Sequence, residues 1–251
     1  MHTYKLDRAG KVEVLQPGLE KAPVIIISGA LANVAELVAY ADEKGLATFA
    51  KGRALYPGVC LSTPEAYRQF IFREVMPIIA DVYQQPQQAL NTLNSDFSIV
   101  NESPDGLQKQ QRLPHCDGPN PRDIAMIHYL CDKSFGGTSL YRHRATGYEY
   151  VTAARQKAYY GKLNQETGDD YQTEYAGYID GSSTLFERYF SCSAALDKLF
   201  IYPCPVLHSG NIPARYIEAI SSDGDSNEVA MAKPSQRRLT ITNFLFNGRA
   251  S

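Results

Sequence analysis

The sequence has little that would direct it to a membrane, a secretory route or a nucleic acid. Its longest apolar run, Val24 to Ile27, is far too short to span a bilayer, and its N-terminus lacks the charged-then-apolar layout of a signal peptide. The 25 Lys and Arg residues nearly balance the 27 Asp and Glu residues, which leaves a net charge of −2 and no basic block. We therefore expect no nucleic acid and no membrane as a partner.

The sequence is also poor in cysteine patterns. It has five cysteines, an odd number, and none of them forms a Cys-x-x-Cys pair. A structural zinc site is therefore not expected, and reduced thiols fit a cytoplasmic protein. Repeats and low-complexity linkers are absent as well, and a composition of 44% hydrophobic and 21% charged residues suits a soluble globular protein. We expect residues 1–251 to form a single domain.

The first third of the chain predicts one strand and then helices over about residues 31–84. Residues 23–28 are a short β-branched run, as in a buried strand. Residues 31–44 place their apolar side chains on one helical face. A second helix is expected to begin with Thr63 as its N-cap, and Pro77 should kink or end it, because proline lacks the amide donor.

From about residue 93 the pattern changes to short strand-like runs separated by Gly, Pro, Asn and Asp. The runs cover residues 97–100, 124–130, 138–141, 199–202 and 239–245. Many short strands preceded by helices predict a mainly β fold with flanking helices, of the α+β class. The arrangement we expect is a jelly-roll barrel with helices packed on one sheet.

Two segments are too long to be simple connections between strands. Residues 152–197 are polar in the middle, and we expect a helix at Thr184–Ser193, because its aromatic residues fall on one helical face. An insertion of this size over a barrel mouth serves as a lid or a scaffold. Residues 219–235 are rich in Ser, Asp, Gly and Asn, and predict a mobile loop.

Three residues have the chemistry of a metal site. His115 and Asp117 are two apart, so on an extended strand their side chains point the same way, while Cys116 faces the opposite side. His208 lies 93 residues (208 − 115) further along the chain, so the fold has to bring it in. Two imidazoles and one carboxylate form the facial triad that holds Fe(II) and leaves positions open for a co-substrate and oxygen.

The segment Arg237-Arg238-Leu239-Thr240 strengthens the interpretation of these three residues as an Fe(II) site. The far carboxylate of a metal-bound 2-oxoacid needs a cation, and the guanidinium fork matches a carboxylate and stays charged when desolvated. Arg238 and Thr240 are two apart on a predicted strand and can reach the same carboxylate. For Arg237 we favour an ordinary ion pair with a surface acid.

Four motifs follow one another along the chain: His-x-Asp, Phe-Gly-Gly-Thr-Ser-Leu-Tyr at 135–141, His208, and Arg-x-Thr on the last strand. This order resembles that of the Fe(II)/2-oxoglutarate-dependent oxygenases. The fit is closer still to an uncharacterised bacterial group within that superfamily, through Tyr-Pro-Gly at 56–58, Arg-His-Arg-Ala-Thr-Gly at 142–147, and Leu-His-Ser-Gly-Asn-Ile at 207–212. Together these motifs cover most of residues 23–246.

The resemblance implies a double-stranded β-helix core of the cupin type. It implies Fe(II) on His115, Asp117 and His208, and 2-oxoglutarate with its distal carboxylate on Arg238. The activity implied is O₂-dependent hydroxylation with decarboxylation of 2-oxoglutarate to succinate. In better-known relatives this arginine follows the distal His by about ten residues, whereas here the gap is 30 (238 − 208), so an inserted loop is required. Arg215 is the rival.

Other polar residues near these motifs have competing interpretations. Tyr129 either leans on the co-substrate or packs, whereas His128, one residue earlier, is more simply a satisfied core histidine. Arg142 and His143 either line a substrate cleft, which we favour because the segment is dense in positive charge, or brace the insertion. Asn243 points into the barrel beside the iron or bonds backbone.

Three functions therefore remain open from the sequence. The first is an oxygenase that acts on a small molecule, an amino acid or a peptide. The second is a cupin-like metal enzyme that keeps the triad and uses no 2-oxoacid. The third is a non-catalytic binding module on the same barrel. The Arg-x-Thr pair favours the first, while the prime substrate and the oligomeric state stay open because they depend on loops and surfaces.

Overall fold

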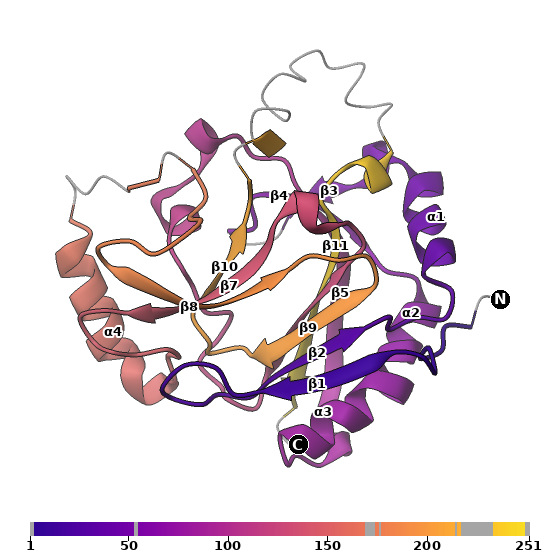
Figure 1. The fold of residues 1–251 in the computed structure, drawn as a ribbon, viewed down its shortest axis with the longest axis horizontal. Coiled ribbons are helices and arrows are strands. Elements are labelled where there is room, and N and C mark those ends of the chain that lie inside the picture. The colour runs from indigo at the N-terminus through magenta and orange to yellow at the C-terminus, as the bar shows by residue number, and fades with distance from the viewer. Residues whose placement is uncertain are drawn as a thin grey trace.

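The chain folds around two antiparallel sheets, one large and one small (Figure 1). The computed structural model describes residues 3–52, 55–168, 174–175, 177–213, 215–216 and 233–248. In order across the large sheet, the strands are β1 (Lys11–Leu15), β2 (Val24–Ser28), β9 (Lys198–Pro203), β6 (Ile124–Tyr129), β11 (Leu239–Asn247), β5 (Leu90–Val100), β4 (Gly58–Ser62) and β3 (Ala50–Lys51). The small sheet consists of β10 (His208–Asn211), β7 (Gly137–His143) and β8 (Phe186–Ser193), in that order.

Helices flank the sheets at both ends of the molecule. Figure 1 shows α1 (Val34–Lys44), α2 (Glu65–Phe70) and α3 (Met76–Val82) on one side and α4 (Ala153–Glu166) at the opposite end. Short 3-10 turns lie at Leu46–Thr48, Gln87–Ala89, Pro104–Gly106, Lys109–Arg112, Lys133–Phe135 and Pro234–Gln236. The fold is mainly antiparallel β with helices, as the composition of predicted elements indicated.

Alternation along the central strands gives the large sheet two different faces. On β11, Ile241 and Leu245 belong to the same buried cluster as side chains of α1, α2 and α3. Thr240, Thr242 and Phe244 occupy the alternate positions and border a cavity on the other side. Because side chains alternate with a period of two, one face packs against helices and the other is left for the small sheet and the cavity.

The small sheet covers only part of that second face. Its Leu140 and Cys192 pack with Phe200 of β9 and Tyr129 of β6. The half of the large sheet formed by β11, β5 and β4 lies beyond this cluster and lines the cavity instead.

All six strands predicted from the sequence are present, and so is the helix expected over residues 31–44. Pro77 does not end its helix. A π-helical segment at Ile71–Val75 precedes α3, with Pro77 in the first turn of α3, where a missing amide donor costs little. Thr63 is not the N-cap of α2, since Pro64 holds that position. The Thr63 hydroxyl donates to Ser95 of β5 instead.

The helix expected at Thr184–Ser193 is wrong, because this segment forms strand β8. Its pairing with β7 shifts between Leu140 and Tyr141, so β8 carries one extra residue there. Such a bulge breaks the alternation of a strand. Phe186, Tyr189 and Phe190 therefore have a spacing that imitates a helical face.

A buried polar chain joins the helices to the large sheet. His128 Nε2 donates to Asp197 Oδ1 at 2.9 Å, and its Nδ1 lies 3.1 Å from the hydroxyl of Tyr67 on α2. Both carboxylate oxygens of Asp197 accept from the backbone amide of Leu31, at 3.1 and 2.9 Å. His128 is fully buried, so it is a satisfied core histidine, as we expected, and stabilises the scaffold.

We expect Asp197→Ala to lower the free energy of unfolding by about 3 kcal/mol, because it leaves the Leu31 amide and His128 buried without an acceptor. Asp197→Asn should cost less, since asparagine tolerates the positive φ of 61° and keeps one acceptor. Urea denaturation measures both. Exposed Asp105→Ala is the control, with an expected change within about 0.5 kcal/mol. Equal costs at Asp197 and Asp105 would show that the chain of bonds does not stabilise the fold.

Candidate metal centre

The centre begins with a backbone contact between two distant segments. The amide of His115 donates to the carbonyl of His208 at 2.9 Å, and the amide of His208 donates to the carbonyl of His115 at 2.8 Å. Two residues that exchange both bonds stand directly opposite each other in an antiparallel ladder, with their side chains on one face. A further bond, from the Asp117 amide to the Cys204 carbonyl at 2.9 Å, extends this contact.

Strand β10 connects the contact to the rest of the small sheet. His208 also pairs with Leu140 of β7, so β10 lies between β7 and the His115 segment. The start of β7 needs glycine because its backbone lies very close to its neighbours. A Cβ on Gly136, whose φ is +90°, would lie 1.9 Å from the carbonyl oxygen of Asn211 on β10. The Gly-Gly pair in the sequence motif is therefore a packing requirement of the small sheet.

The three predicted metal ligands converge. His115 Nε2 lies 3.8 Å from Asp117 Oδ1, and His208 Nε2 lies 3.4 Å from Asp117 Oδ2. One ligand atom from each residue lies within 4.8 Å of the others. Ligands bound about 2.1 Å from one ion and at right angles to each other are about 3 Å apart, so small side-chain adjustments would bring all three onto one cation.

Hydrogen bonds orient both imidazoles. His208 Nδ1 donates to the carbonyl of Val206 at 2.9 Å, which leaves Nε2, the atom that faces Asp117, with a free lone pair. His115 forms a hydrogen bond with the backbone of Leu113. Burial lowers the pKa of His208 to about 4. Burial, and then the adjacent His208, lower the pKa of His115 to about 4 as well. Both rings are therefore neutral at pH 7, which is the form that binds metals.

Asp117 supplies the only carboxylate of the cluster. Burial raises its pKa to about 6, and the neighbouring His115 partly opposes that rise. At neutral pH the group is thus mainly ionised but poorly solvated, with its side chain 14% exposed. A bound cation would compensate the cost of burying this charge. Cys116, between the two ligands, contacts Tyr160 of α4 with a separation of 3.7 Å between sulfur and hydroxyl.

The three side chains border a cavity of about 780 Å³. The cavity lies against the uncovered half of the large sheet, and α4 contributes Tyr159 and Tyr160 to its wall. The side chain of His115 is 55% exposed, because the ring borders the open space of the cavity. A small molecule in the cavity can therefore reach the cluster.

Arg238 borders the same cavity and is 5% exposed. Its Nε donates to the carbonyl of Phe135 at 3.1 Å and its Nη2 to that of Gly137 at 2.8 Å. Within the described residues no carboxylate lies within ion-pair distance of it. Arg215, the rival, bonds the carbonyl of Ser134 at an exposed position outside the cavity lining. The structure thus places Arg238, rather than Arg215, where it can meet an anion in the cavity.

The two other residues expected near a co-substrate have different surroundings. Thr240 borders the cavity, and its hydroxyl donates to the carbonyl of Ser98 at 3.2 Å. Tyr129 is fully buried in the core between the sheets, and its hydroxyl donates to Thr138 at 2.7 Å. Tyr129 therefore packs, and it is Thr138, its partner, that reaches the cavity.

Arg142 and His143 do not border the cavity, contrary to the cleft we favoured for them. Arg142 forms ion pairs with Glu149, which is 1% exposed, and with Glu187 at 2.8 Å. His143 Nε2 bonds Glu166 at the end of α4 at 2.8 Å. Each residue is paired with a nearby carboxylate. Both therefore brace the segment that carries α4.

Asn243 also lies away from the cavity. Its Oδ1 accepts from Ser95 at 2.7 Å, and its Nδ2 is 3.4 Å from the hydroxyl of Tyr67 on α2. It is three positions from Thr240, and a strand with a period of two puts such residues on opposite faces. The expectation that Asn243 points towards the metal is therefore wrong. Residues 219–232 of the expected mobile loop lie outside the described residues.

Some cavity residues were not singled out from the sequence. Tyr202 of β9 packs its ring 4.8 Å from that of His208, measured between centroids. Asp96, Asn94 and Ser62 line the uncovered half of the large sheet. In the sequence these residues are the polar positions of strands in which polar and apolar residues alternate. A strand with one face in solvent has the same pattern, so the pattern did not indicate a site.

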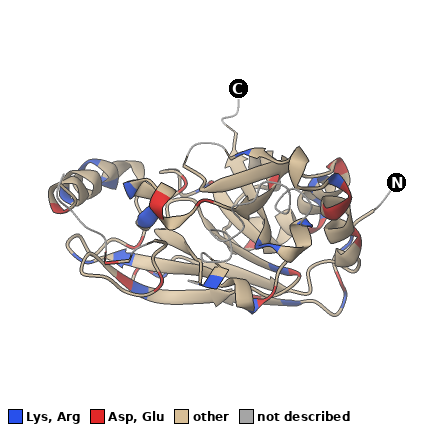
Figure 2. Ribbon diagram, turned by 90° about the horizontal axis from the view of Figure 1, so that it is seen from above, with Lys and Arg blue, Asp and Glu red and all other residues tan. Residues whose placement is uncertain are grey.

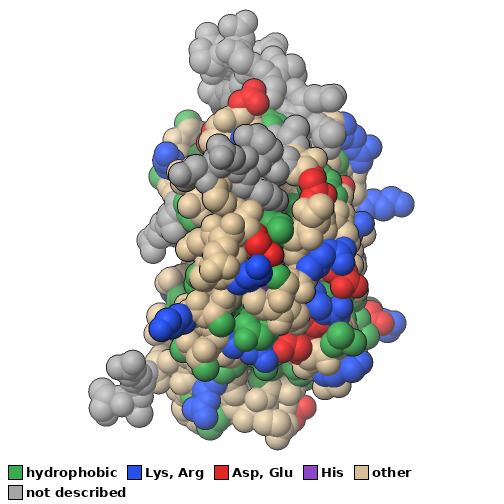
Figure 3. All heavy atoms as spheres, turned by 90° about the vertical axis from the view of Figure 1, so that its left-hand side faces the viewer, with side chains coloured by type: hydrophobic (Ala, Val, Ile, Leu, Met, Phe, Trp, Pro, Cys, Tyr) green, Lys and Arg blue, Asp and Glu red, His purple; other side chains and the backbone are tan. Residues whose placement is uncertain are grey.

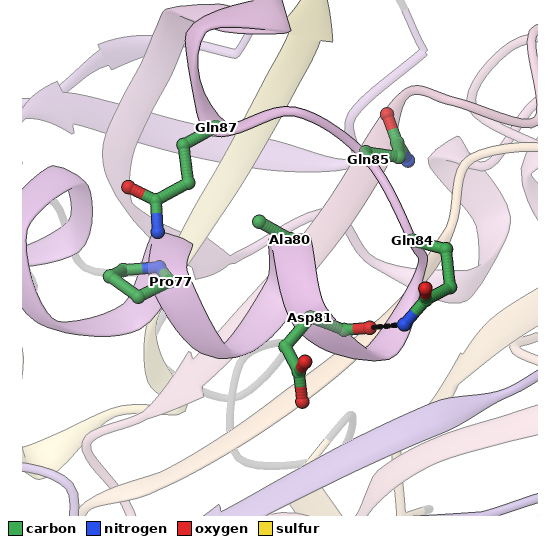
Figure 4. A pocket seen from close by; sticks show the side chains of 6 residues that line it. All are labelled: Pro77, Ala80, Asp81, Gln84, Gln85 and Gln87. Atoms are coloured by element: carbon green, nitrogen blue, oxygen red, sulfur yellow. Dashed lines mark hydrogen bonds between the residues drawn. The ribbon is translucent and has the colours of Figure 1, made fainter.

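A second hollow, of about 330 Å³, is at the end of α3 (Figure 4). Figure 4 shows glutamines around it, with Gln84 bonded to the backbone of Asp81. It has no cluster of metal-binding groups, and it lies on the helix side of the sheet, away from the triad. The triad cavity is therefore the candidate site.

The surface charges are mixed. Figure 2 shows basic and acidic residues side by side along the length of the molecule. Figure 3 shows the two signs interspersed over the end that carries α4. None of the described helices has the length and apolar character needed to cross a membrane.

Comparisons with known proteins give a family and distant structural likenesses. The model of a family described as "Family of unknown function (DUF6445)" matches residues 8–245. No curated protein sequence matches.

Among solved structures, the non-heme alpha ketoglutarate dependent epimerase SnoN from nogalamycin biosynthesis is 12% identical to this chain. The match covers 92% of this chain and 78% of that chain, with a TM-score of 0.44. The carbocyclase SnoK, from the same biosynthesis, is 12% identical, with 90% and 81% covered and a TM-score of 0.45. Likenesses at these scores carry no argument about this chain.

We expect His208→Ala and Asp117→Ala each to abolish stoichiometric binding of Fe(II), because two remaining ligands form a much weaker site. Anaerobic titration with Fe(II), or with Co(II) as a spectroscopic substitute, measures the stoichiometry. His143→Ala is a matched control, since it removes an imidazole outside the cluster and should leave binding intact. Stoichiometric iron in both ligand variants, with circular dichroism unchanged, would refute the centre.

Proposed function

We propose that this chain, which belongs to the DUF6445 family of unknown function, is an Fe(II)- and 2-oxoglutarate-dependent oxygenase. The observation that supports this most is the convergence of His115, Asp117 and His208 at the edge of one cavity. Two imidazoles and one carboxylate are the ligand set of non-heme Fe(II) oxygenases. We further propose that the two facing sheets are the halves of a double-stranded β-helix.

The donor set fits iron in its chemistry and in its protonation. Both imidazoles are neutral at pH 7, His208 has a free Nε2, and the carboxylate is available as an anion. All three residues border the cavity, so a ligand in the cavity could complete the coordination of a bound ion. A zinc site of the structural kind would use four protein ligands, whereas the described residues supply three.

Arg238 is the residue that would hold the distal carboxylate of 2-oxoglutarate. A buried guanidinium without an anionic partner is costly, and a dicarboxylate in the cavity would compensate that cost. The Nε and Nη2 bonds to backbone carbonyls fix the plane of the guanidinium, and Thr240 adds a hydroxyl nearby on the same face. This anion site separates the proposal from a cupin-like enzyme that uses no 2-oxoacid.

Iron held by His115, Asp117 and His208, with 2-oxoglutarate on Arg238, would supply the oxidising chemistry, in which O₂ and 2-oxoglutarate are consumed as a C–H bond of the substrate is oxidised. The chain supplies what surrounds them. Tyr202 packs against His208 on one side of the centre, together with the apolar core between the sheets. These side chains exclude water on that side. Val206 and Leu113 hold the imidazoles in their orientation. A small molecule, an amino acid or a peptide end is the substrate that a cavity of this volume admits.

We expect the iron-loaded protein to convert 2-oxoglutarate to succinate slowly even without a prime substrate. Succinate is measured by chromatography after incubation with Fe(II), ascorbate and air. Asp117→Ala is the negative control, because it lacks the carboxylate ligand. Tight iron binding with no succinate from any 2-oxoacid would favour the cupin-like alternative, and absence of both would favour a binding module.

We expect Arg238→Lys to raise the concentration of 2-oxoglutarate needed for half-maximal turnover by about tenfold or more, because a lysine loses the bidentate geometry. Iron stoichiometry should not change. Arg215→Lys makes the same chemical change outside the cavity and should have no effect. An increase for Arg215→Lys alone would transfer the role to that residue.

A further inference from the structure

The cavity has a polar floor that neither the triad nor Arg238 uses. It is the inner face of β11, β5 and β4, the half of the large sheet beyond the small sheet. Register places Ser62, Asp96 and Thr242 side by side across these three strands. The next row along, two residues away, contains Cys60, Ser98 and Thr240. Residues paired in this way share one face, so the rows form a continuous surface under the cavity.

Asp96 is the one acidic side chain of this floor. The hydroxyl of Ser62 donates to its Oδ1 at 2.9 Å. No Lys, Arg or His of the described residues is within ion-pair distance of it, and its Oδ2 has no donor among them. Aspartate is unfavourable in the middle of a strand, and here it is half-buried and borders the cavity.

The lysine of the cavity lining, Lys51, forms no ion pair with Asp96. Lys51 of β3 borders the cavity and pairs in register with Val59. Val59 packs against the core on the helix side of the sheet. Since residues directly opposite in a ladder point the same way, the Lys51 side chain belongs to the other face. The negative charge of the floor is therefore open to a ligand.

The surroundings of Asp96 suit a cation attached to an apolar body. Asn94 and Thr242 provide oxygen acceptors beside it. Phe244, the next residue on this face of β11, is diagonal to Asp96 and offers an aromatic ring, with Phe246 stacked at 6.3 Å between centroids. An ammonium has three donors and no acceptor, and it is attracted to aromatic faces.

We infer that Asp96 binds an amine of the prime substrate, and that the substrate class is an amine carried on an apolar or aromatic body. The inference rests on the proposed function for the identity of the reaction, but the contact with Asp96 does not pass through the metal. Asp96 is a specificity residue in this scheme. It anchors one end of the molecule on the floor, while the other end extends towards the triad.

Isothermal titration calorimetry with four matched probes tests the inference. The probes are 2-phenylethylamine, L-phenylalanine, N-acetyl-2-phenylethylamine and 3-phenylpropionate, each titrated into the full chain with and without Fe(II) and 2-oxoglutarate under anaerobic conditions. We expect at least one of the two amines to bind more tightly than the neutral and anionic probes. Asp96→Asn should weaken amine binding by about tenfold or more, since it removes the charge and keeps the shape.

Asp81→Asn is the matched control, because Asp81 lines the hollow in Figure 4, outside the triad cavity. It should bind the amines like the unaltered protein. Two outcomes would overturn the inference: amine binding that Asp96→Asn leaves unchanged, or binding by neither amine at millimolar concentration. Titrations of iron and 2-oxoglutarate on the same samples separate the two proposals. If both bind and the amines do not, only the substrate class fails; if neither binds but the amines do, only the oxygenase assignment fails.

Discussion

The whole centre depends on one pair of backbone hydrogen bonds, between His115 and His208. The bonds hold two segments 93 residues apart (208 − 115) in a fixed register, so that both imidazoles project from one side of the ladder. A slip of one residue would turn one of the rings away and destroy the cluster. The positions of these two candidate ligands are therefore set by a backbone bridge that ties the segment at His115 to strand β10. Gly136 contributes indirectly, because its lack of a Cβ lets β7 start close beside β10.

The unequal size of the two sheets creates the space in front of this centre. If the small sheet extended over β5 and β4, side chains would fill the cavity as they fill the core around Phe200 and Tyr129. Because it stops short, the inner face of those strands stays open, and polar residues occupy its positions. The opposite face of the same strands does not border the cavity. It is packed with apolar side chains against helices.

Sequence reasoning reached the features that depend on local pattern. Short strand-like runs separated by Gly, Pro, Asn and Asp predicted most central strands, and the two-residue spacing of His115 and Asp117 predicted a shared face. The prediction failed where the structure of a residue depends on a partner far away in the sequence. The bulge opposite Leu140 made β8 look helical, and carboxylates far along the chain occupy Arg142 and His143. Asn243 was a different error, since its odd separation from Thr240 already placed it on the other face. The register of His115 with His208 was beyond any local pattern.

Three charged side chains that border the cavity lack an ionic partner among the described residues. Asp117, Arg238 and Asp96 all border it, and none forms an ion pair with a Lys, an Arg or an acid within the described residues. For Asp117 and Arg238, which are largely buried, stability alone would favour an ionic partner, because an unpaired buried charge costs several kcal/mol, about the margin of stability of a domain, whereas Asp96 is half-buried. The three charges lie apart, on the triad, at the start of β11 and on the floor of β5. Each therefore calls for a different complementary group: a metal cation, an anion and an organic cation. A single ligand could satisfy one of them, whereas a metal, a dicarboxylate and an amine together would satisfy all three.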